Sequence, residues 1–394
     1  MSETPISFSA ARQIHGLLKD KQVEIEEFIR ALIETESPSG DEAGSRAVVD
    51  LLAEAASPIG CVSGIKRVDV PDFGQHLVIE AFGHQRSEGQ ILVVGHTDTV
   101  HARGSVEARP WRRESGKIYG PGIFDMKANC ALILAVLRAM AELKIAPKCG
   151  VTVALTCDEE VGSFTGWPLI EETAKSANTR CAFVMEPPAL GGLVKTGRKG
   201  TGIFAMKVEG KAAHAGLEPE KGASAILELA RQTERLHSLN GSGSGITVNV
   251  GVVRGGTRSN VVAAEAEAEI DVRFSTEAES REIERLLGNV TPIDDRTKVF
   301  GSGGINPPPL ERTPAVIELF QQGRAIASHL GFELGEAQVG GASDGNFVAA
   351  LGIPVLDGLG ISGDGAHAVH EHIEADDIAR RGGLIGGLLI SNSC

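Results

Sequence analysis

Apolar residues in the first half of the chain follow two alternating patterns. Helical spacing of apolar side chains extends over residues 8–36, 41–57 and 126–143. Short apolar runs, which are typical of buried strands, occur in "HLVIEAF", "ILVVGHTDTV", "GVTVALTCDEEVGS" and "CAFVMEP". Because strands that alternate with helices build sheets of parallel strands, this part of the chain predicts an α/β fold.

The pattern changes after about residue 198. Strand-like runs around residues 202–216, 245–256 and 264–275 combine with helical patterns near 222–238 and 277–288 in a β-α-β-β-α order. Polar and apolar residues alternate in "AEAEAEIDVRF", which indicates a sheet with one face in water. This segment therefore predicts a smaller α+β domain.

Helix–strand alternation resumes from about residue 310 and ends in a helix that starts near residue 375. We therefore predict a main α/β domain over residues 1–197 and 310–394, with a mixed, mostly parallel sheet flanked by helices. The smaller domain, residues 198–309, interrupts it. A length of 394 residues agrees with two domains.

Charge and composition narrow the class of protein. The net charge of -14 argues against nucleic acid and anionic membranes as partners, because both require a basic face. The start of the chain lacks the basic segment and apolar core of a signal peptide, and no apolar stretch reaches the ~18 residues of a membrane span. The six cysteines lack CxxC spacing, and several lie in apolar runs typical of reduced thiols. We expect a cytoplasmic protein.

Side chains that bind metals gather at the ends of the predicted strands, where open α/β sheets bind their ligands. These residues are His96, Asp98, Asp125, Glu159, Glu160, Glu186 and His367. Imidazole and carboxylate ligands without thiolates are typical of catalytic zinc-type sites that leave a position open for water. Two such metals can share a bridging carboxylate, polarise a carbonyl and lower the pKa of a bound water to ~7.

Four of these acidic residues allow more than one interpretation. Asp125 lies between a glycine-rich turn and a long apolar helix, so it could cap that helix or bind a metal. Asp98 is two residues after His96 and could accept the second ring N–H of that histidine. Glu159 and Glu160 are adjacent and point in different directions, so one can bind metal while the other acts as a general base.

Seven motifs, in order, resemble the co-catalytic zinc exopeptidase family. They are "GHTDTV", "YGPGIFDMKAN", "TCDEEVGS", "MEP", "KAAHAG", "GGASDGNF" and "GAHAVHEHIE". This family includes glutamate carboxypeptidase, aminoacylase, acetylornithine deacetylase and succinyl-diaminopimelate desuccinylase. The likeness to glutamate carboxypeptidase is the closest, chiefly through "YGPGIFDMK" and "DEEVGS".

The resemblance implies a binuclear zinc site, in which Co²⁺ or Mn²⁺ could replace Zn²⁺. Asp125 would bridge the two ions, His96 and Glu186 would complete one site, and Glu160 and His367 the other. It also implies a cis peptide bond after Asp125.

The resemblance also assigns roles around the metals. Glu159 would take a proton from the bridging water and deliver it to the leaving amine. His370 and His372 compete with His367 for the last ligand position. The family pattern places the metal-binding histidine four residues before a glutamate, which favours His367.

The smaller domain resembles the family's lid and dimerisation domain, which implies a homodimer. His214 would then reach a neighbouring active site and stabilise the oxyanion of the tetrahedral intermediate. Asn260 and Arg273 match positions that hold the substrate's free carboxylate, a task that suits the planar guanidinium of arginine.

One position departs from the family pattern. Pro307 stands where relatives often carry an arginine just before the prolines. If that arginine grips the substrate carboxylate, Arg258, Lys195 or Arg198 must replace it, or the leaving group differs.

The sequence thus predicts a zinc-dependent metallohydrolase, similar to glutamate carboxypeptidase. It would cleave the amide bond of a C-terminal or N-acylated amino acid, with a peptide or N-acyl amino acid as substrate. An N-acyl amino-acid deacylase or desuccinylase is the first alternative, because it uses the same chemistry with a different pocket. A catalytically silent ligand-binding homologue is the second, and the complete ligand set together with Glu159 speaks against it.

Overall fold

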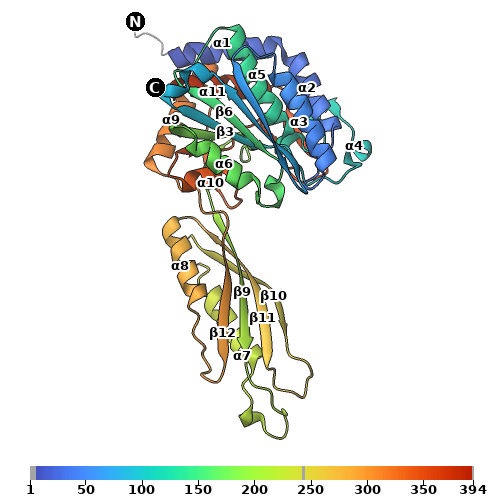
Figure 1. Cartoon of the computed structure of the whole chain (residues 1–394), viewed down its shortest axis with the longest axis vertical. Coiled ribbons are helices and arrows are strands. Elements are labelled where there is room, and N and C mark those ends of the chain that lie inside the picture. Colours follow the sequence, from blue (N-terminus) through green and yellow to red (C-terminus); the bar gives the residue numbers. More distant parts are fainter. Residues whose placement is uncertain (1–5, 242–244, 393–394) are drawn as a thin grey trace. The chain divides into compact units, whose positions relative to one another are not determined.

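The computed structural model describes residues 6–241 and 245–392, which form two compact units (Figure 1). The first unit contains residues up to 196 together with 312–338 and those from 343, and the second contains 197–311 and 339–342. The boundaries expected from the sequence lie within two residues of 196/197 and 311/312. Residues 339–342 group with the second unit.

A six-stranded sheet forms the centre of the first unit. Its order is β1 (Val62–Val70), β2 (Gly74–Ala81), β6 (Gly150–Thr156), β3 (Gln90–His96), β7 (Thr179–Val184) and β14 (Val355–Leu356). The pairs β3–β6, β3–β7 and β7–β14 are parallel, whereas β1–β2 and β2–β6 are antiparallel. The predicted mixed, mostly parallel sheet is thus confirmed. Strand β1 escaped prediction because it lies at the sheet edge and is half exposed, without a continuous apolar run.

Helices pack around this sheet. They are α1 (Ile6–Asp20), α2 (Gln22–Glu34), α3 (Glu42–Ala56), α5 (Ala128–Glu142), α6 (Gly166–Lys175), α9 (Pro314–Leu330), α10 (Asp344–Ala350) and α11 (Asp377–Ser391). The single helix expected over 8–36 is two helices that meet at Lys21. The break lets α1 pack on α11 while α2 packs on α5.

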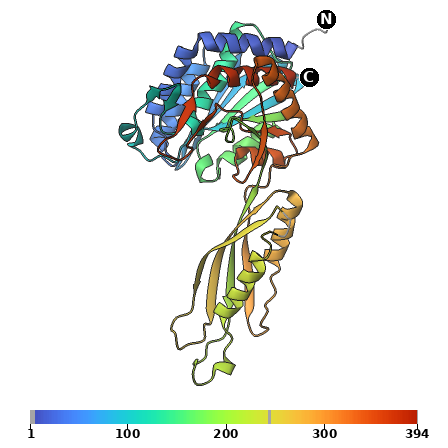
Figure 2. The ribbon, with the colours of Figure 1, turned by 180° about the vertical axis from the view of Figure 1, so that it is seen from behind.

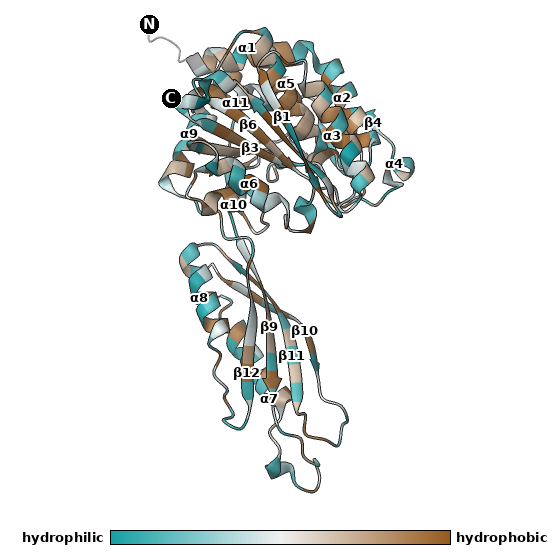
Figure 3. Ribbon diagram, in the orientation of Figure 1, coloured by the Kyte–Doolittle hydropathy of each residue, from teal (hydrophilic) through white to brown (hydrophobic). Residues whose placement is uncertain are grey.

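Helix α5 is apolar on almost all sides, as its brown colour in Figure 3 shows. A helix of this kind is stable only when it is surrounded, and α5 packs against α1, α2, α3 and α11. Among the residues that the structure describes, no helix is long and apolar enough to cross a membrane.

Short elements in the first unit bring distant loops together. A small sheet pairs β15 (Gly363–Asp364), β16 (His372–Glu374), β5 (Lys117–Tyr119) and β4 (Arg112–Glu114) in that order. Strands β8 (Val194–Arg198) and β13 (Glu336–Val339) pair separately, and α4 spans Ser105–Ala108. The β5–β16 pairing places the loop before β16 beside the turn that follows β5, two segments about 250 residues apart.

The second unit is an antiparallel sheet with two helices on one face (Figure 2). The strand order is β10 (Thr247–Gly255), β11 (Glu265–Phe274), β9 (Gly200–Glu209) and β12 (Lys298–Ile305), and the helices are α7 (Ala225–His237) and α8 (Glu277–Gly288). The alternation read from β11 is real, because its buried and exposed residues alternate regularly. Strand β12 escaped prediction because its sequence, "KVFGSGGI", is rich in glycine and weak in strand propensity.

Candidate metal centre

The ends of three neighbouring strands position most of the candidate ligands. Strand β3 is parallel to both β6 and β7, so all three end at the same edge of the sheet. His96 is the last residue of β3, Glu159 and Glu160 follow β6, and Glu186 follows β7. The fold therefore brings together residues that are up to 90 positions apart.

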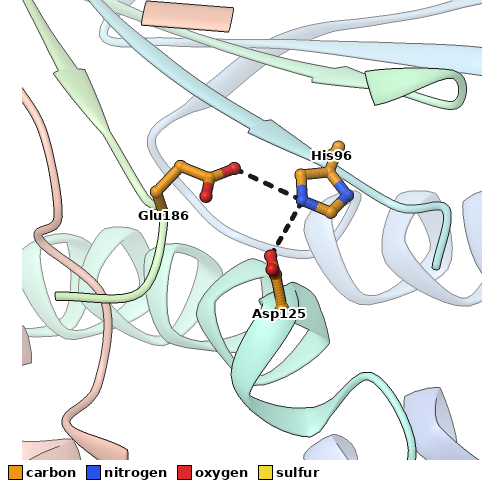
Figure 4. A group of neighbouring side chains, drawn as sticks. All are labelled: His96, Asp125 and Glu186. Carbon is orange, nitrogen blue, oxygen red and sulfur yellow. Dashed lines mark hydrogen bonds and ion pairs between the residues drawn. The ribbon is translucent and has the colours of Figure 1, made fainter. Parts of the chain in front are cut away.

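The first group of ligand atoms comes from His96, Asp125 and Glu186, which point toward one another (Figure 4). His96 Nε2 lies 3.2 Å from Asp125 Oδ1 and 3.3 Å from Glu186 Oε1. The exposed fractions of His96 and Glu186 are 1% and 8%. One imidazole and two carboxylates around a single point are a ligand set that suits a divalent zinc-type ion.

A second group forms on the other side of Asp125. His367 Nε2 lies 3.0 Å from Glu160 Oε2 and 3.4 Å from Asp125 Oδ2. Asp125 thus directs one oxygen to each group. This arrangement fits two cations that share one carboxylate.

The position of Asp125 bears on the two interpretations left open by its sequence context. It lies in the irregular turn Ile123–Lys127 before α5, and its side chain makes no capping bond to that helix. Its carboxylate instead contacts the imidazoles of His96 and His367. The peptide bond between Asp125 and Met126 is cis, as the resemblance implied.

Asp98 contacts both His96 and the turn that carries Glu159 and Glu160. His96 Nδ1 is 3.0 Å from the backbone carbonyl of Asp98 and 3.4 Å from its carboxylate, so the carbonyl is the nearer acceptor. Because a carbonyl only accepts, Nδ1 carries the hydrogen and Nε2 keeps a lone pair for a metal. The Asp98 carboxylate accepts the backbone N–H groups of Glu159 and Glu160, both at 3.2 Å, and the hydroxyl of Ser39 at 2.7 Å. It therefore fixes the turn that carries both glutamates.

The electrostatics of this cluster show a shortage of positive charge. Burial and the neighbouring Asp125 carboxylate raise the pKa of Glu160 to about 8. Burial and the Glu186 carboxylate raise the pKa of Glu159 well above its usual value. Oε1 of Glu160 is buried and has no hydrogen-bond partner among the described residues. Excess carboxylates and an unpartnered oxygen fit a site that binds cations.

The two histidines that competed with His367 lie outside both groups. His370 is exposed, whereas His372 is buried, with Nε2 3.0 Å from Lys117 Nζ and Nδ1 2.9 Å from the carbonyl of His370. Within the described part of the chain, His367 is therefore the histidine of this loop that joins the carboxylates.

One buried carboxylate near the site had no role assigned from the sequence. Asp344, at the start of α10, accepts hydroxyl hydrogen bonds from Thr156 at 2.8 Å and from Ser163. Burial raises its pKa to about 7. Thr156 precedes the turn with Glu159 and Glu160, and Ser163 follows it. The Asp344 carboxylate therefore holds both ends of this turn. In the sequence, only the family motif "GGASDGNF", which contains Asp344, pointed to this residue.

Comparison with known proteins decides the family. The profile described as peptidase family M20/M25/M40 matches residues 92–390 of the chain. The chain belongs to this peptidase family. The family resemblance read from the motifs is thus confirmed, and the M20 protein is a hydrolytic enzyme that acts on peptide or amide bonds.

The chain is similar to M20 relatives of different specificity. Carboxypeptidase G2 from Pseudomonas sp. (strain RS-16) is 28% identical over 369 residues, which cover 92% of this chain and 88% of the relative. Succinyl-diaminopimelate desuccinylase from Delftia acidovorans is also 28% identical, over 88% of this chain and 92% of the relative. The YXEP protein of Bacillus subtilis, described as a dinuclear metal-binding peptidase, has the same fold, with a TM-score of 0.69, 16% identity, and coverage of 95% of this chain and 98% of that one.

The remaining site residues expected from the sequence lie in the second unit of the M20 protein. His214, Arg258 and Asn260 lie in exposed loops at one end of its sheet, where Ala215 N–H donates to the Asn260 carbonyl at 3.0 Å. The guanidinium of Arg258 has no hydrogen-bond or ion-pair partner among the described residues.

Arg273 lies at the other end of the same sheet. It is eight residues beyond Glu265 on β11, which corresponds to ~26 Å of extended strand. Its Nε and Nη2 both lie 3.0 Å from the Asp271 carboxylate, and Nη1 donates to Thr201 Oγ1 at 2.8 Å. The structure therefore does not bring Arg273 together with Asn260 in one chain, and Asp271 already occupies much of its guanidinium.

Arg198, one of the residues weighed as a substitute for the missing arginine at Pro307, is buried. Its Nη1 donates to the carbonyls of Gly341 and Ala342, both at 3.1 Å. These bonds help to hold residues 339–342 in the second unit. The exposed Arg258 is the better candidate for a substrate contact.

Proposed function

We propose that this M20 enzyme is a two-zinc carboxypeptidase that resembles glutamate carboxypeptidase and releases a C-terminal or N-acylated amino acid. The observation that carries the proposal is the pair of ligand groups that share Asp125, with Glu159 next to the ligand Glu160. The described ligand set is imidazole and carboxylate alone, which favours Zn²⁺ and also permits Co²⁺ or Mn²⁺.

The residues around the two ligand groups have different roles in the proposed hydrolysis. When bound, two zinc ions would polarise the substrate carbonyl and lower the pKa of a water. Glu159 belongs to neither ligand group, and Asp98 fixes its backbone. Its carboxylate takes the proton from the attacking water and delivers it to the nitrogen of the leaving amine. His96 stays oriented because its Nδ1–H is held by the Asp98 carbonyl.

Binding of the substrate carboxylate is assigned to Asn260, Arg258 and Arg273, with His214 as donor to the oxyanion. His214 and Arg273 lie at opposite ends of the second unit, so one small substrate can meet both only if they come from different chains. This separation supports a homodimer formed through residues 198–309.

The surface of the second unit supports the same assembly. Strand β10 is an edge strand, and its side chains Val252 and Val253 are 37% and 58% exposed. Ile226 and Leu227 at the start of α7 are also exposed, and a Cβ atom on Gly255, at the end of β10, would lie 3.1 Å from Ile226 Cγ1. An exposed edge strand with apolar side chains is a natural pairing surface for a second copy.

A deacylase or desuccinylase is the second candidate. The 28% identity to a desuccinylase equals that to carboxypeptidase G2 and favours neither substrate. The proposal also includes a cytoplasmic location, which is supported by the five described cysteines, all free thiols.

A combined metal and substrate measurement tests this function. The purified protein would be analysed for metal and then assayed on N-acyl amino acids, acyl-glutamates, folate-type conjugates and short dipeptides, with and without added zinc. We expect about two metal ions per chain and chelator-sensitive cleavage, fastest for substrates with a C-terminal glutamate. Faster cleavage of N-succinyl or N-acetyl amino acids would favour the deacylase. A protein that neither contains nor takes up metal would contradict the proposal.

A further inference from the structure

Glu371 is a buried carboxylate that follows the ligand His367 by four residues, yet it joins neither ligand group. Its Oε1 accepts the backbone N–H of Phe124 at 2.9 Å and that of Asp125 at 3.0 Å. Its Oε2 accepts the backbone N–H of Gly122 at 2.7 Å. One side chain thus collects three N–H groups from the turn that carries the bridging carboxylate.

A fourth donor completes the set. His101 Nε2 lies 2.6 Å from Glu371 Oε2, and His101 Nδ1 lies 3.2 Å from Arg109 Nη2. Because a guanidinium is always a donor, Nδ1 accepts and Nε2 carries the hydrogen that His101 donates to Glu371. The four donors occupy the acceptor positions of Glu371, which explains why this buried carboxylate has none left for a metal.

The same network reaches the second ligand loop. Arg109 Nη1 donates to the carbonyl of Ala368 at 3.4 Å, directly after His367. His101 and Arg109 lie on one segment, Asp125 on a second and His367 on a third. Glu371 and its two partners therefore connect three segments that are remote in sequence.

We propose that Glu371 is a positioning residue that sets the bridging carboxylate of Asp125, with His101 and Arg109 holding Glu371 in place. This inference rests on the proposed two-metal site. Asp125 directs one oxygen to each group, so a small shift of its turn changes both groups at once. Residues that orient metal ligands typically contribute 10–100-fold to metal affinity or activity.

Glu371→Gln tests the proposal, because the amide nitrogen cannot accept and would face backbone N–H donors. Glu374→Gln is the matched control. It lies three residues later, is half exposed, and its nearest cation is Lys117 Nζ at 3.5 Å. We expect E371Q to bind Zn²⁺ and Co²⁺ about 10–100-fold more weakly in calorimetric titration, with an altered visible spectrum of the Co²⁺ protein. On the best substrate, kcat should fall at least tenfold with KM little changed, because Glu371 touches ligand turns and not substrate. E374Q should match the wild type.

Wild-type metal affinity, spectrum and kcat in folded E371Q would overturn the proposal. If E371Q does not fold, His101→Ala decides, because Glu371 then keeps its three backbone donors. We expect H101A to weaken metal binding in the same direction by a smaller factor, and unchanged binding would refute the network. The wild type distinguishes this result from failure of the proposed function. If the proposed function is wrong, the wild type itself binds no pair of metal ions or cleaves none of the amides.

Discussion

At the scale of single residues, the chemistry of this site depends on which carboxylates bind and which position others. Asp125, Glu160 and Glu186 direct oxygens at histidines, whereas Asp98 and Glu371 accept backbone N–H groups from the loops that carry the ligands. Both kinds of carboxylate are buried, and only their hydrogen bonds distinguish them. A buried carboxylate with filled acceptor positions holds a loop, and one with an unpartnered oxygen is available to a cation.

Glu159→Gln tests the general base. We expect the variant to retain both metals, because Glu159 is in neither ligand group, while kcat falls by roughly 10²–10⁴ because an amide cannot take the proton. Metal content and steady-state kinetics measure this. Glu172→Gln on α6, an exposed glutamate 3.6 Å from Lys66, is the control and should behave as wild type. Undiminished turnover in E159Q would remove Glu159 from the mechanism.

At the scale of elements, helix α11 illustrates how close packing shapes the first unit. Its sequence "RRGGLIGGLL" carries four glycines in two pairs, and α11 packs on α1. A Cβ atom on Gly383 would lie 2.9 Å from His15 Cβ, 3.0 Å from the Ala11 carbonyl and 3.1 Å from Leu330 Cδ1. Glycine at this position therefore lets the two helices approach.

Gly383→Ala should destabilise the protein although alanine favours helices. Overpacking costs about 1–3 kcal/mol and is offset in part by the roughly 1 kcal/mol gained from helix propensity, so the net loss is up to about 2 kcal/mol. Gly16→Ala on α1 is the matched control, because a Cβ there meets nothing within 4 Å. It should stabilise by the propensity term alone. Thermal unfolding of the metal-free proteins compares them, and equal or opposite shifts would contradict the packing argument.

The sequence predicted the strands whose residues are uniformly buried or regularly alternate between buried and exposed, and it missed the strands without such a pattern. The buried strands β3, β6 and β7 read as apolar runs, and the one-sided strand β11 read as an alternation. Strands β1 and β12 lie at sheet edges and carry polar residues or glycine, so no periodic signal marks them. The break at Lys21 also left no signal, because it serves the packing of α1 chiefly on α11 and of α2 on α5.

At the scale of the whole molecule, the proposed mechanism makes a complete active site depend on assembly of two chains. His214 and Arg273 occupy opposite ends of the second unit, so the proposed mechanism requires two chains. The exposed edge β10, with Val253 58% exposed, is the expected contact.

Light scattering and mixed dimers test this assembly. We expect a homodimer, which Val253→Asp dissociates and which Val23→Asp, on the exposed surface of α2, leaves intact. His214→Ala should remain dimeric and lose roughly 10²–10³ in kcat, as expected for an oxyanion donor. Random exchange of H214A and E159Q chains makes about half of the dimers mixed, and one of the two sites in each mixed dimer is intact. The mixture should therefore recover about a quarter of the wild-type activity. No recovery, or a fully active monomer, would rule out action of His214 across the dimer.

The sequence by itself determined the fold class and the family, and it named the candidate ligands. The fold class and the candidate ligands follow from local signals, namely the period of apolar residues and the placement of histidine and carboxylates at strand ends. The family follows from the resemblance of the seven ordered motifs. His96, Asp125, Glu160, Glu186 and His367 could thus be named before their geometry was seen.

Only the tertiary structure showed which of the buried carboxylates point at histidines and which hold the loops that carry the ligands. The hydrogen bonds of Glu371 and the hydroxyl donors of Asp344 join residues up to about 250 positions apart, and no periodicity marks such contacts. The same holds for Asp98, whose carboxylate holds the Glu159–Glu160 turn while its carbonyl orients His96. Local patterns record which face of an element is buried, whereas the partner that meets that face is set by the packing of the whole chain.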